Sequence, residues 1–143
     1  MKKILLAQTD TTVGFLSQNA ERLEEVKMRE GNKPFLKVYS EFSTLRNAIR
    51  IPLYFRGVVR HARKTTFIVK NQAFRYVGDT EHARLIQPYG WLYSTSANPS
   101  GGSFDNTFCF DRSDWVIEDS RGLQELSASH IYKLGRVRRR RIR

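Results

Sequence analysis

The residues best suited to chemistry lie in one short stretch, Ser94 to Gly101, which reads Ser-Thr-Ser-Ala-Asn-Pro-Ser-Gly. It follows the apolar run Trp91-Leu92-Tyr93, which is typical of the end of a strand. Hydroxyls, a side-chain amide and backbone N–H groups donate hydrogen bonds, and glycine lets a backbone come close to a ligand. Such a loop can hold phosphate groups. The same residue types also form ordinary surface turns, so the loop by itself leaves both interpretations open.

Two earlier segments carry the same kind of residues. Gln8 to Phe15 reads Gln-Thr-Asp-Thr-Thr-Val-Gly-Phe and follows the apolar start Ile4 to Ala7. One predicted helix later, Lys27 to Pro34 reads Lys-Met-Arg-Glu-Gly-Asn-Lys-Pro. Hydroxyls in the first segment and cations in the second are groups that bind anionic ligands.

Taken in chain order, the segments that begin at Gln8, Lys27 and Ser94 resemble motifs of the YrdC/YciO family, the threonylcarbamoyl-AMP synthases. The resemblance rests on an intact Ser-Thr-Ser-Ala-Asn-x-Ser-Gly, on Lys-x-Arg-x-x-x-Lys-Pro, and on a degraded Pro-Thr-Asp-Thr-Val-Tyr-Gly-Leu. Weaker matches continue it at Thr65–Val69, Ala73–Val77, Ser127–Ile131 and the arginine-rich end of the chain. The family implies a YrdC-like α/β (α+β) fold: a twisted, open, mixed β-sheet with flanking helices around a concave cavity.

The resemblance also implies a reaction and a set of residues. The family joins L-threonine, bicarbonate and ATP, which arrives with Mg²⁺, into threonylcarbamoyl-AMP and pyrophosphate for the threonylcarbamoyladenosine modification of tRNA. The catalytic residues would be Lys27, Arg29 and Lys33. The nucleotide would be held by Lys27, Arg29, Thr66, Ser94, Ser96 and Asn98. The threonine substrate would be held by Thr11, Arg75, Ser127 and Ser129, and one arginine of Arg138–Arg143 would reach ATP.

Departures from the family pattern leave other functions open. Gln8 replaces a proline, Val13 a tyrosine and His130 a threonine, and Ala62-Arg63-Lys64 replaces a Pro-Gly-Pro turn. The segment between Lys33 and Thr66 is also shorter than in the family. One alternative is a non-catalytic YrdC-like protein that binds RNA, namely tRNA, rRNA or double-stranded RNA. Another is a carbamoyl-transfer domain of the hydrogenase-maturation type. Partner proteins of tRNA modification are a further expectation.

The charge distribution favours an anionic partner. The formal net charge is +11, and the last eight residues hold six arginines and no acid. From Phe42 to Gly78 the chain has eight basic residues and no Asp or Glu. Such a field concentrates polyanions, although charged runs also serve simply as solvated surface.

Length and composition indicate the number of domains and exclude some classes of protein. At 143 residues with 40% hydrophobic content the chain is long enough for one folded domain, which we place at 1–143 with an arginine-rich strand or tail at 136–143. The one cysteine, Cys109, excludes an intramolecular disulfide and is expected in the core between Phe108 and Phe110. We predict no metal site, no membrane segment and a cytoplasmic location.

The elements that must position these residues follow from apolar patterns and caps. A helix that ends near Gly31 would be needed for Lys27 and Arg29 to point into one site. Predicted helices cover 17–29, with Ser17 or Asn19 as the cap, 42–49, 53–60, and a stretch from Asp79 or Thr80 to Gln87. Predicted strands cover 2–8, 34–39, 65–70, 73–77, 91–96, 115–118, 129–134 and 136–142.

Overall fold

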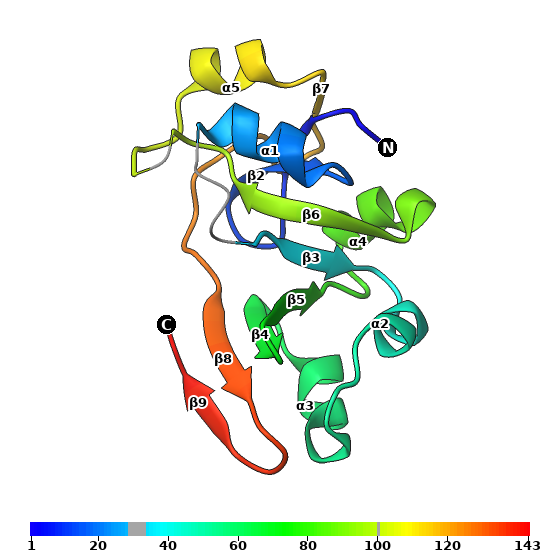
Figure 1. Cartoon of the computed structure of the whole chain (residues 1–143). Helices are drawn as coiled ribbons and strands as arrows, with labels where there is room; N and C mark the ends of the chain where they lie inside the picture. Colours follow the sequence, from blue (N-terminus) through cyan, green and yellow to red (C-terminus); the bar gives the residue numbers. More distant parts are fainter. Residues whose placement is uncertain (29–33, 100) are drawn as a thin grey trace. The chain divides into compact units, whose positions relative to one another are not determined.

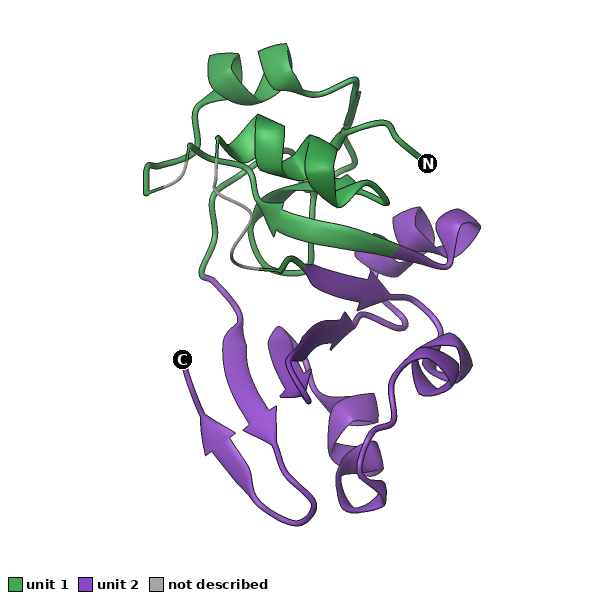
Figure 2. Cartoon of the chain, viewed as in Figure 1, with its two compact units in different colours: residues 1–35, 92–127 green, residues 36–91, 128–143 purple. Residues whose placement is uncertain are grey.

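A computed structural model of the chain describes residues 1–28, 34–99 and 101–143, which form two compact units. Unit 1 contains residues 1–35 and 92–127, and unit 2 contains residues 36–91 and 128–143 (Figure 2). Over the described residues the structure has nine strands and five α-helices (Figure 1). Each unit combines parallel and antiparallel strand pairs with helices, so the mixed α/β class predicted from the sequence is confirmed.

Unit 1 is built on a four-stranded arrangement in the order β7-β1-β2-β6. Its strands are β1 (Leu5–Gln8), β2 (Val13–Ser17), β6 (Trp91–Ser96) and β7 (Trp115–Ile117), and its helices are α1 (Ala20–Lys27) and α5 (Asn106–Arg112). β2 pairs antiparallel with both β1 and β6, and β7 runs parallel to β1. Leu6 and Phe15 form one core cluster with Leu23 of α1 and Cys109 of α5, so both helices pack on the sheet face that carries these residues.

Unit 2 places its strands in the order β3-β5-β4-β8-β9. They are β3 (Leu36–Tyr39), β4 (Thr65–Val69), β5 (Gln72–Tyr76), β8 (His130–Leu134) and β9 (Arg139–Arg141). Its helices are α2 (Phe42–Ala48), α3 (Arg56–His61) and α4 (Glu81–Ile86), with 3-10 turns η1 (Leu53–Phe55) and η2 (Gln87–Tyr89). Apolar side chains of α2, η1 and α3 pack against Phe67 and Phe74 in a core of their own.

The helix ends agree with the predicted caps and correct one boundary. Asn19 and Thr80 cap α1 and α4, each accepting from a backbone N–H three residues on. α1 ends at Lys27 because Met28 adopts a left-handed conformation with φ of 53°, so the prediction that the helix reaches residue 29 was wrong. Gly31, which we expected to end it, lies outside the described residues.

Two elements were not predicted, and several boundaries differ. β2 is buried along its whole length, so it lacks the alternation that marks a half-exposed strand. α5 begins at the N-cap Asp105 but is rich in aromatic residues, which have modest helix propensity. β1 begins at Leu5 rather than residue 2, the predicted helix 53–60 is η1 followed by α3, and the last strand is confined to β9.

Candidate functional site

In unit 1 the Lys27 side chain joins the end of α1 to the loop after β6. We call Lys27, Ser96 and Asn98 the Lys27 cluster. The ammonium donates to the backbone oxygens of Ser96 (2.9 Å) and Asn98 (2.8 Å) and to Asn98 Oδ1 (2.9 Å), with Ser96 Oγ at 3.4 Å. Lys27 is only 4% exposed. Two segments of the sequence that were singled out separately are thus in direct contact, and their contact is a buried cation surrounded by oxygen atoms.

Two serine hydroxyls of β6 lie on one face of the strand. Ser94 and Ser96 are two residues apart on a strand and therefore face the same side. Ser94 is buried, whereas Ser96 is exposed at the end of the strand. Gly14 of β2 pairs with Ser96, and a Cβ at Gly14 would lie 3.1 Å from the backbone oxygen of Thr95. The glycine therefore allows β2 to approach the strand that carries these hydroxyls.

The loop between β1 and β2 is organised by Thr9. Its hydroxyl donates to the Thr12 carbonyl (2.6 Å), accepts from the Thr11 N–H (3.1 Å) and lies 3.2 Å from Thr11 Oγ1. Thr11, the predicted threonine ligand, is buried in this turn. The turn therefore fixes the Thr11 hydroxyl through local bonds.

Sequence reasoning did not identify the residues that hold this loop from outside. The Arg121 guanidinium donates to the carbonyls of Gln8 and Thr9, both at 3.2 Å. Gln8 itself donates to the Thr11 carbonyl and accepts from Gln124 N at 2.9 Å. A proline at position 8 could make neither bond with its side chain, so the departure from the motif here has a structural role. Arg121 belongs to none of the motifs, and no signal in one sequence marks it.

Unit 2 contains a second group, which we call the Arg75 cluster: Arg75, Thr66, Ser129 and Arg143. The Arg75 guanidinium lies 3.3 Å from Thr66 Oγ1, which is 2.9 Å from Ser129 Oγ. Arg143 reaches the same Ser129 hydroxyl (3.2 Å) and donates to the Ser129 carbonyl (2.9 Å). Arg75, Thr66 and Ser129 are all at most 4% exposed. Two guanidinium groups joined by two hydroxyls can hold a carboxylate or a phosphate.

The structure brings some of the predicted site residues together and separates others by unit. Lys27, Ser96 and Asn98 are in contact in unit 1, and Thr66, Arg75 and Ser129 are in contact in unit 2. Ser127 is exposed and belongs to unit 1, whereas Ser129 is buried. Among the final arginines, Arg143 is the one that contacts Ser129. Arg29 and Lys33 lie outside the described residues.

Cys109 is a core residue, as predicted. It is completely buried, and its thiol donates to the Ala97 carbonyl at 3.2 Å. Burial raises the pKa of this thiol, because the thiolate would lose its hydration. A buried thiol with a raised pKa is a poor nucleophile at neutral pH.

Two further observations concern metals and membranes. Within residues 1–28, 34–99 and 101–143, no three His, Cys, Asp or Glu side chains gather as a metal site would require. No helix in this part of the chain combines the length and apolar character needed to cross a bilayer.

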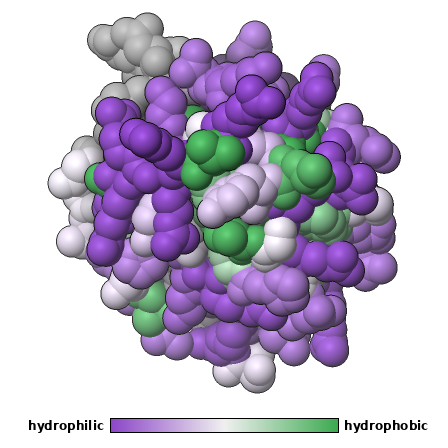
Figure 3. Space-filling model, turned by 90° about the horizontal axis from the view of Figure 1, so that it is seen from below, coloured by the Kyte–Doolittle hydropathy of each residue, from purple (hydrophilic) through white to green (hydrophobic). Residues whose placement is uncertain are grey.

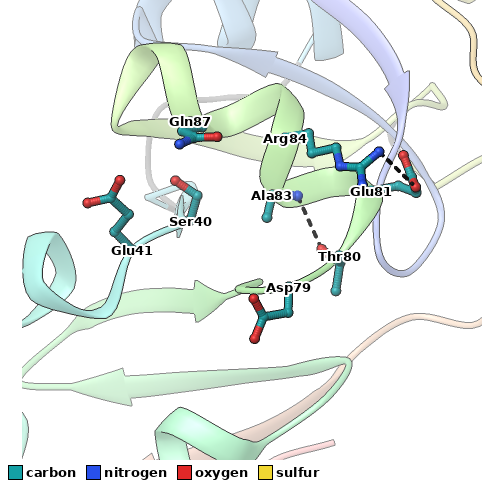
Figure 4. Close-up of a pocket in the computed structure, with 8 residues that line it drawn as sticks. All are labelled: Ser40, Glu41, Asp79, Thr80, Glu81, Ala83, Arg84 and Gln87. Carbon is teal, nitrogen blue, oxygen red and sulfur yellow. Dashed lines mark hydrogen bonds and ion pairs between the residues drawn. The ribbon is translucent and has the colours of Figure 1, made fainter.

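A pocket of about 460 Å³ in unit 2 has a lining that includes none of the predicted site residues (Figure 4). Its lining includes the carboxylates of Glu41, Asp79 and Glu81, and the guanidinium of Arg84 is paired with Glu81 at 3.4 Å. This surplus of negative charge opposes the binding of a phosphate or carboxylate. The pocket therefore does not suit the triphosphate of ATP.

Solved structures of other proteins share the fold of this chain. The chain superposes on Sua5 of P. abyssi, solved in complex with L-threonine, with a TM-score of 0.79 at 18% identity over 99% of its length. It superposes on E. coli YciO with a TM-score of 0.73 at 16% identity, again over 99% of its length. The chain has the fold of Sua5 and YciO. The fold that we expected from the YrdC/YciO resemblance is therefore confirmed.

The chain covers different shares of the proteins to which it is similar. The chain spans 50% of the Sua5 chain and 82% of YciO. One curated relative, the uncharacterized protein MG259 homolog of Mycoplasma pneumoniae, is 29% identical over 94 residues, which cover 63% of this chain and 19% of that protein. No family profile matches the chain. Activity, substrates and partners are accordingly matters of proposal.

Proposed function

We propose that this protein is an L-threonylcarbamoyladenylate synthase. The observation that carries the proposal is the Lys27 cluster: the lysine of one motif is bonded to the loop of another, 69 and 71 residues further along the chain. The resemblance assigns both segments to one nucleotide site, and this contact was not part of the resemblance itself. The Sua5 fold supports the same proposal.

In the proposed reaction the protein positions anions and stabilises charge. The amine of L-threonine and bicarbonate give a carbamate with loss of one water. One carbamate oxygen then attacks the α-phosphorus of ATP, the bond from that phosphorus to the bridging oxygen breaks, and pyrophosphate leaves. Such a displacement depends on alignment and electrostatic stabilisation. Lys27 with the β6 loop would bind the phosphates, and Arg29 and Lys33 would add positive charge. Thr66 would bind the nucleotide, and it contacts Arg75 and Ser129, which are assigned to threonine.

In unit 2 Arg75 would bind the threonine carboxylate. The Thr66 hydroxyl lies between Arg75 and Ser129, so it would fix the direction of the guanidinium. Mg²⁺ would arrive bound to the ATP phosphates and need no dedicated protein cage. Its chemistry there is to neutralise phosphate charge.

The first test is pyrophosphate release from ATP by the purified protein with Mg²⁺, with threonine or bicarbonate omitted in turn. The proposal expects release only when both are present, together with threonylcarbamoyl-AMP in the mass spectrum. Saturable ATP binding without release under any of these conditions would contradict it. Release that continues without threonine would indicate a different nucleotide hydrolase.

A second test addresses Arg75. Arg75→Lys keeps the charge but loses the planar fork that binds a carboxylate with two bonds. We expect the KM for threonine to rise at least tenfold and the KM for ATP to change less than threefold. Arg46→Lys, at an exposed position of α2, is the matched control and should change neither. Equal rises in both KM values would contradict the assignment of Arg75 to threonine.

One observation favours the alternative, a non-catalytic protein that binds tRNA or double-stranded RNA. All three residues of β9 are arginines, and all are exposed. Phosphate backbones are bound by such surfaces without base recognition. Under this alternative RNA affinity is independent of threonine and bicarbonate and no pyrophosphate is released. Under the leading proposal, threonylcarbamoyl-AMP passes to partner proteins of tRNA modification. We expect a cytoplasmic location for either function.

A further inference from the structure

The segment from η1 to α3 carries an exposed apolar patch that the proposed function does not use. Leu53 is 77% exposed, Tyr54 69% and Val58 39%. Tyr54 and Val58 are four residues apart and Gly57 lies between them along the chain, with open space where its Cβ would be. We call Leu53, Tyr54, Gly57 and Val58 the η1–α3 patch. On the face seen in Figure 3, apolar side chains gather in a small area enclosed by hydrophilic ones.

The backbone beneath the patch is firmly anchored. Phe55 and Val59, interleaved with the patch residues, are 4% and 1% exposed and belong to the core of unit 2. The Tyr54 ring packs edge-on against Phe55 with a centroid distance of 5.0 Å. Large apolar side chains held outward on an anchored element lose little further freedom on binding, which favours a docking surface.

The charges that flank the patch along the chain, which we call its basic rim, are of one sign. Arg50, Arg60, Arg63 and Lys64 are all exposed, and the sequence has no acid between Phe42 and Gly78. An apolar centre with a basic rim is complementary to a protein surface that presents apolar side chains among carboxylates.

The centre of the patch decides between kinds of anionic partner. RNA bases stack on flat aromatic or guanidinium groups, and Tyr54 offers one such face, whereas the exposed side chains of Leu53 and Val58 are aliphatic and offer none. Helices that lie on membranes usually have a longer apolar face than the nine residues of Leu53–His61. We propose that the η1–α3 patch is a docking site for an acidic amphipathic helix of a partner protein, bound through apolar anchors and oriented by the basic rim.

The test uses a defined probe and fluorescence anisotropy. The probe is a labelled 18-residue helical peptide with leucines on one face and glutamates elsewhere, and its control has the same composition with the leucines distributed around the helix. We expect the first peptide to bind at least ten times more tightly than the second. Leu53→Ser combined with Val58→Ser should weaken the binding of the first peptide at least tenfold.

Controls make each outcome informative. Leu126→Ser combined with Val137→Ser changes two other apolar residues, 47% and 58% exposed, and should alter the affinity less than twofold. Equal binding of the two peptides, or unchanged binding by the Leu53/Val58 variant, would overturn the proposal. The proposal would also be overturned if the Leu53/Val58 variant lost at least tenfold of its affinity for a 20-residue oligouridine or for phosphatidylcholine–phosphatidylserine vesicles. The first result would assign the patch to RNA and the second to lipid. Far-ultraviolet circular dichroism confirms that each variant is folded.

Discussion

Lys27 shows how one residue can serve both structure and a proposed reaction. Its ammonium is buried and bonded to Ser96 and Asn98, so it connects α1 with the β6 loop before any ligand is considered. An anion that binds there must share or replace these oxygen acceptors. A loss of activity in a Lys27 variant can therefore arise from the loop as well as from the missing charge.

The variant Lys27→Met separates the two effects. It removes the donor and leaves the partly buried carbonyl oxygens of Ser96 and Asn98 less satisfied, which costs about 1–3 kcal/mol. We expect urea unfolding to show a loss of that size in the free energy of unfolding, and pyrophosphate release to fall more than this loss of folded protein explains. Lys133→Met, at an exposed position, should change stability by less than about 0.5 kcal/mol. Unchanged stability for Lys27→Met would contradict the structural role.

Cys109 predicts a dependence of stability on pH. Its pKa in the folded protein is raised because burial disfavours the thiolate. As pH rises, the unfolded chain loses this proton first, so the contribution is fully present below about pH 8.5, the ordinary thiol pKa, and is lost as pH rises toward the raised pKa. We expect urea unfolding to show a larger fall in stability between pH 7 and pH 9.5 for the native sequence than for Cys109→Ala. Equal falls in the two proteins would contradict this prediction.

At the level of elements, the contact between β2 and β6 depends on Gly14. A Cβ there would lie 2.9 Å from Thr9 Cγ2 and 3.1 Å from the Thr95 carbonyl oxygen. The carbonyl belongs to β6 and cannot move without disturbing the strand pair, so we expect Gly14→Ala to destabilise the protein by about 1–3 kcal/mol.

Gly57 provides the opposite case. It lies inside α3, and a Cβ added to it would have no neighbouring atom within 4 Å. We expect Gly57→Ala to stabilise the protein by about 0.5–1 kcal/mol, because alanine restricts the unfolded chain and favours the helix. Thermal and urea unfolding of the two variants measure both changes. A stable Gly14→Ala protein would show that β2 and β6 are not held as closely as described.

Elements were predictable from the sequence where polarity and caps marked them. Two helix starts were each predicted to within two candidate caps, Ser17 or Asn19 and Asp79 or Thr80, and Asn19 and Thr80 are the ones whose side chains accept from backbone N–H groups. β2 could not be recognised in the same way, because all five of its residues are buried and its sequence lacks alternation. For α5 the tertiary packing of Cys109 outweighs the modest helix propensity of its aromatic residues.

At the level of the whole molecule, the arginine-rich end predicts a salt-dependent affinity for RNA. All of these arginines are exposed, but Arg139 also lies over the Tyr132 ring and Arg143 bonds Ser129, so we single out Arg136, Arg138 and Arg140. Changing these three to glutamine removes charge while leaving those two contacts in place. If all three bind phosphates, the slope of log affinity against log salt should become shallower by about 2 for a single-stranded RNA.

Fluorescence anisotropy over a range of salt concentrations measures this slope. Lys2→Gln, Lys3→Gln and Arg46→Gln together remove the same charge from other exposed positions and serve as the control. If the two triple variants show the same slope, the affinity comes from overall charge and not from the end of the chain.

The sequence by itself determined which groups could bind anions and the class of fold, because short motifs, caps and apolar runs act locally. Tertiary structure decided which of those groups meet: Lys27 with Asn98, and Arg75 with Ser129 through Thr66. It also brought Ser129 into contact with Thr66 and Arg143, and it revealed Arg121 on the β1–β2 loop. These choices depend on strand register and on contacts between residues far apart in sequence. A single sequence does not encode such contacts in any local pattern.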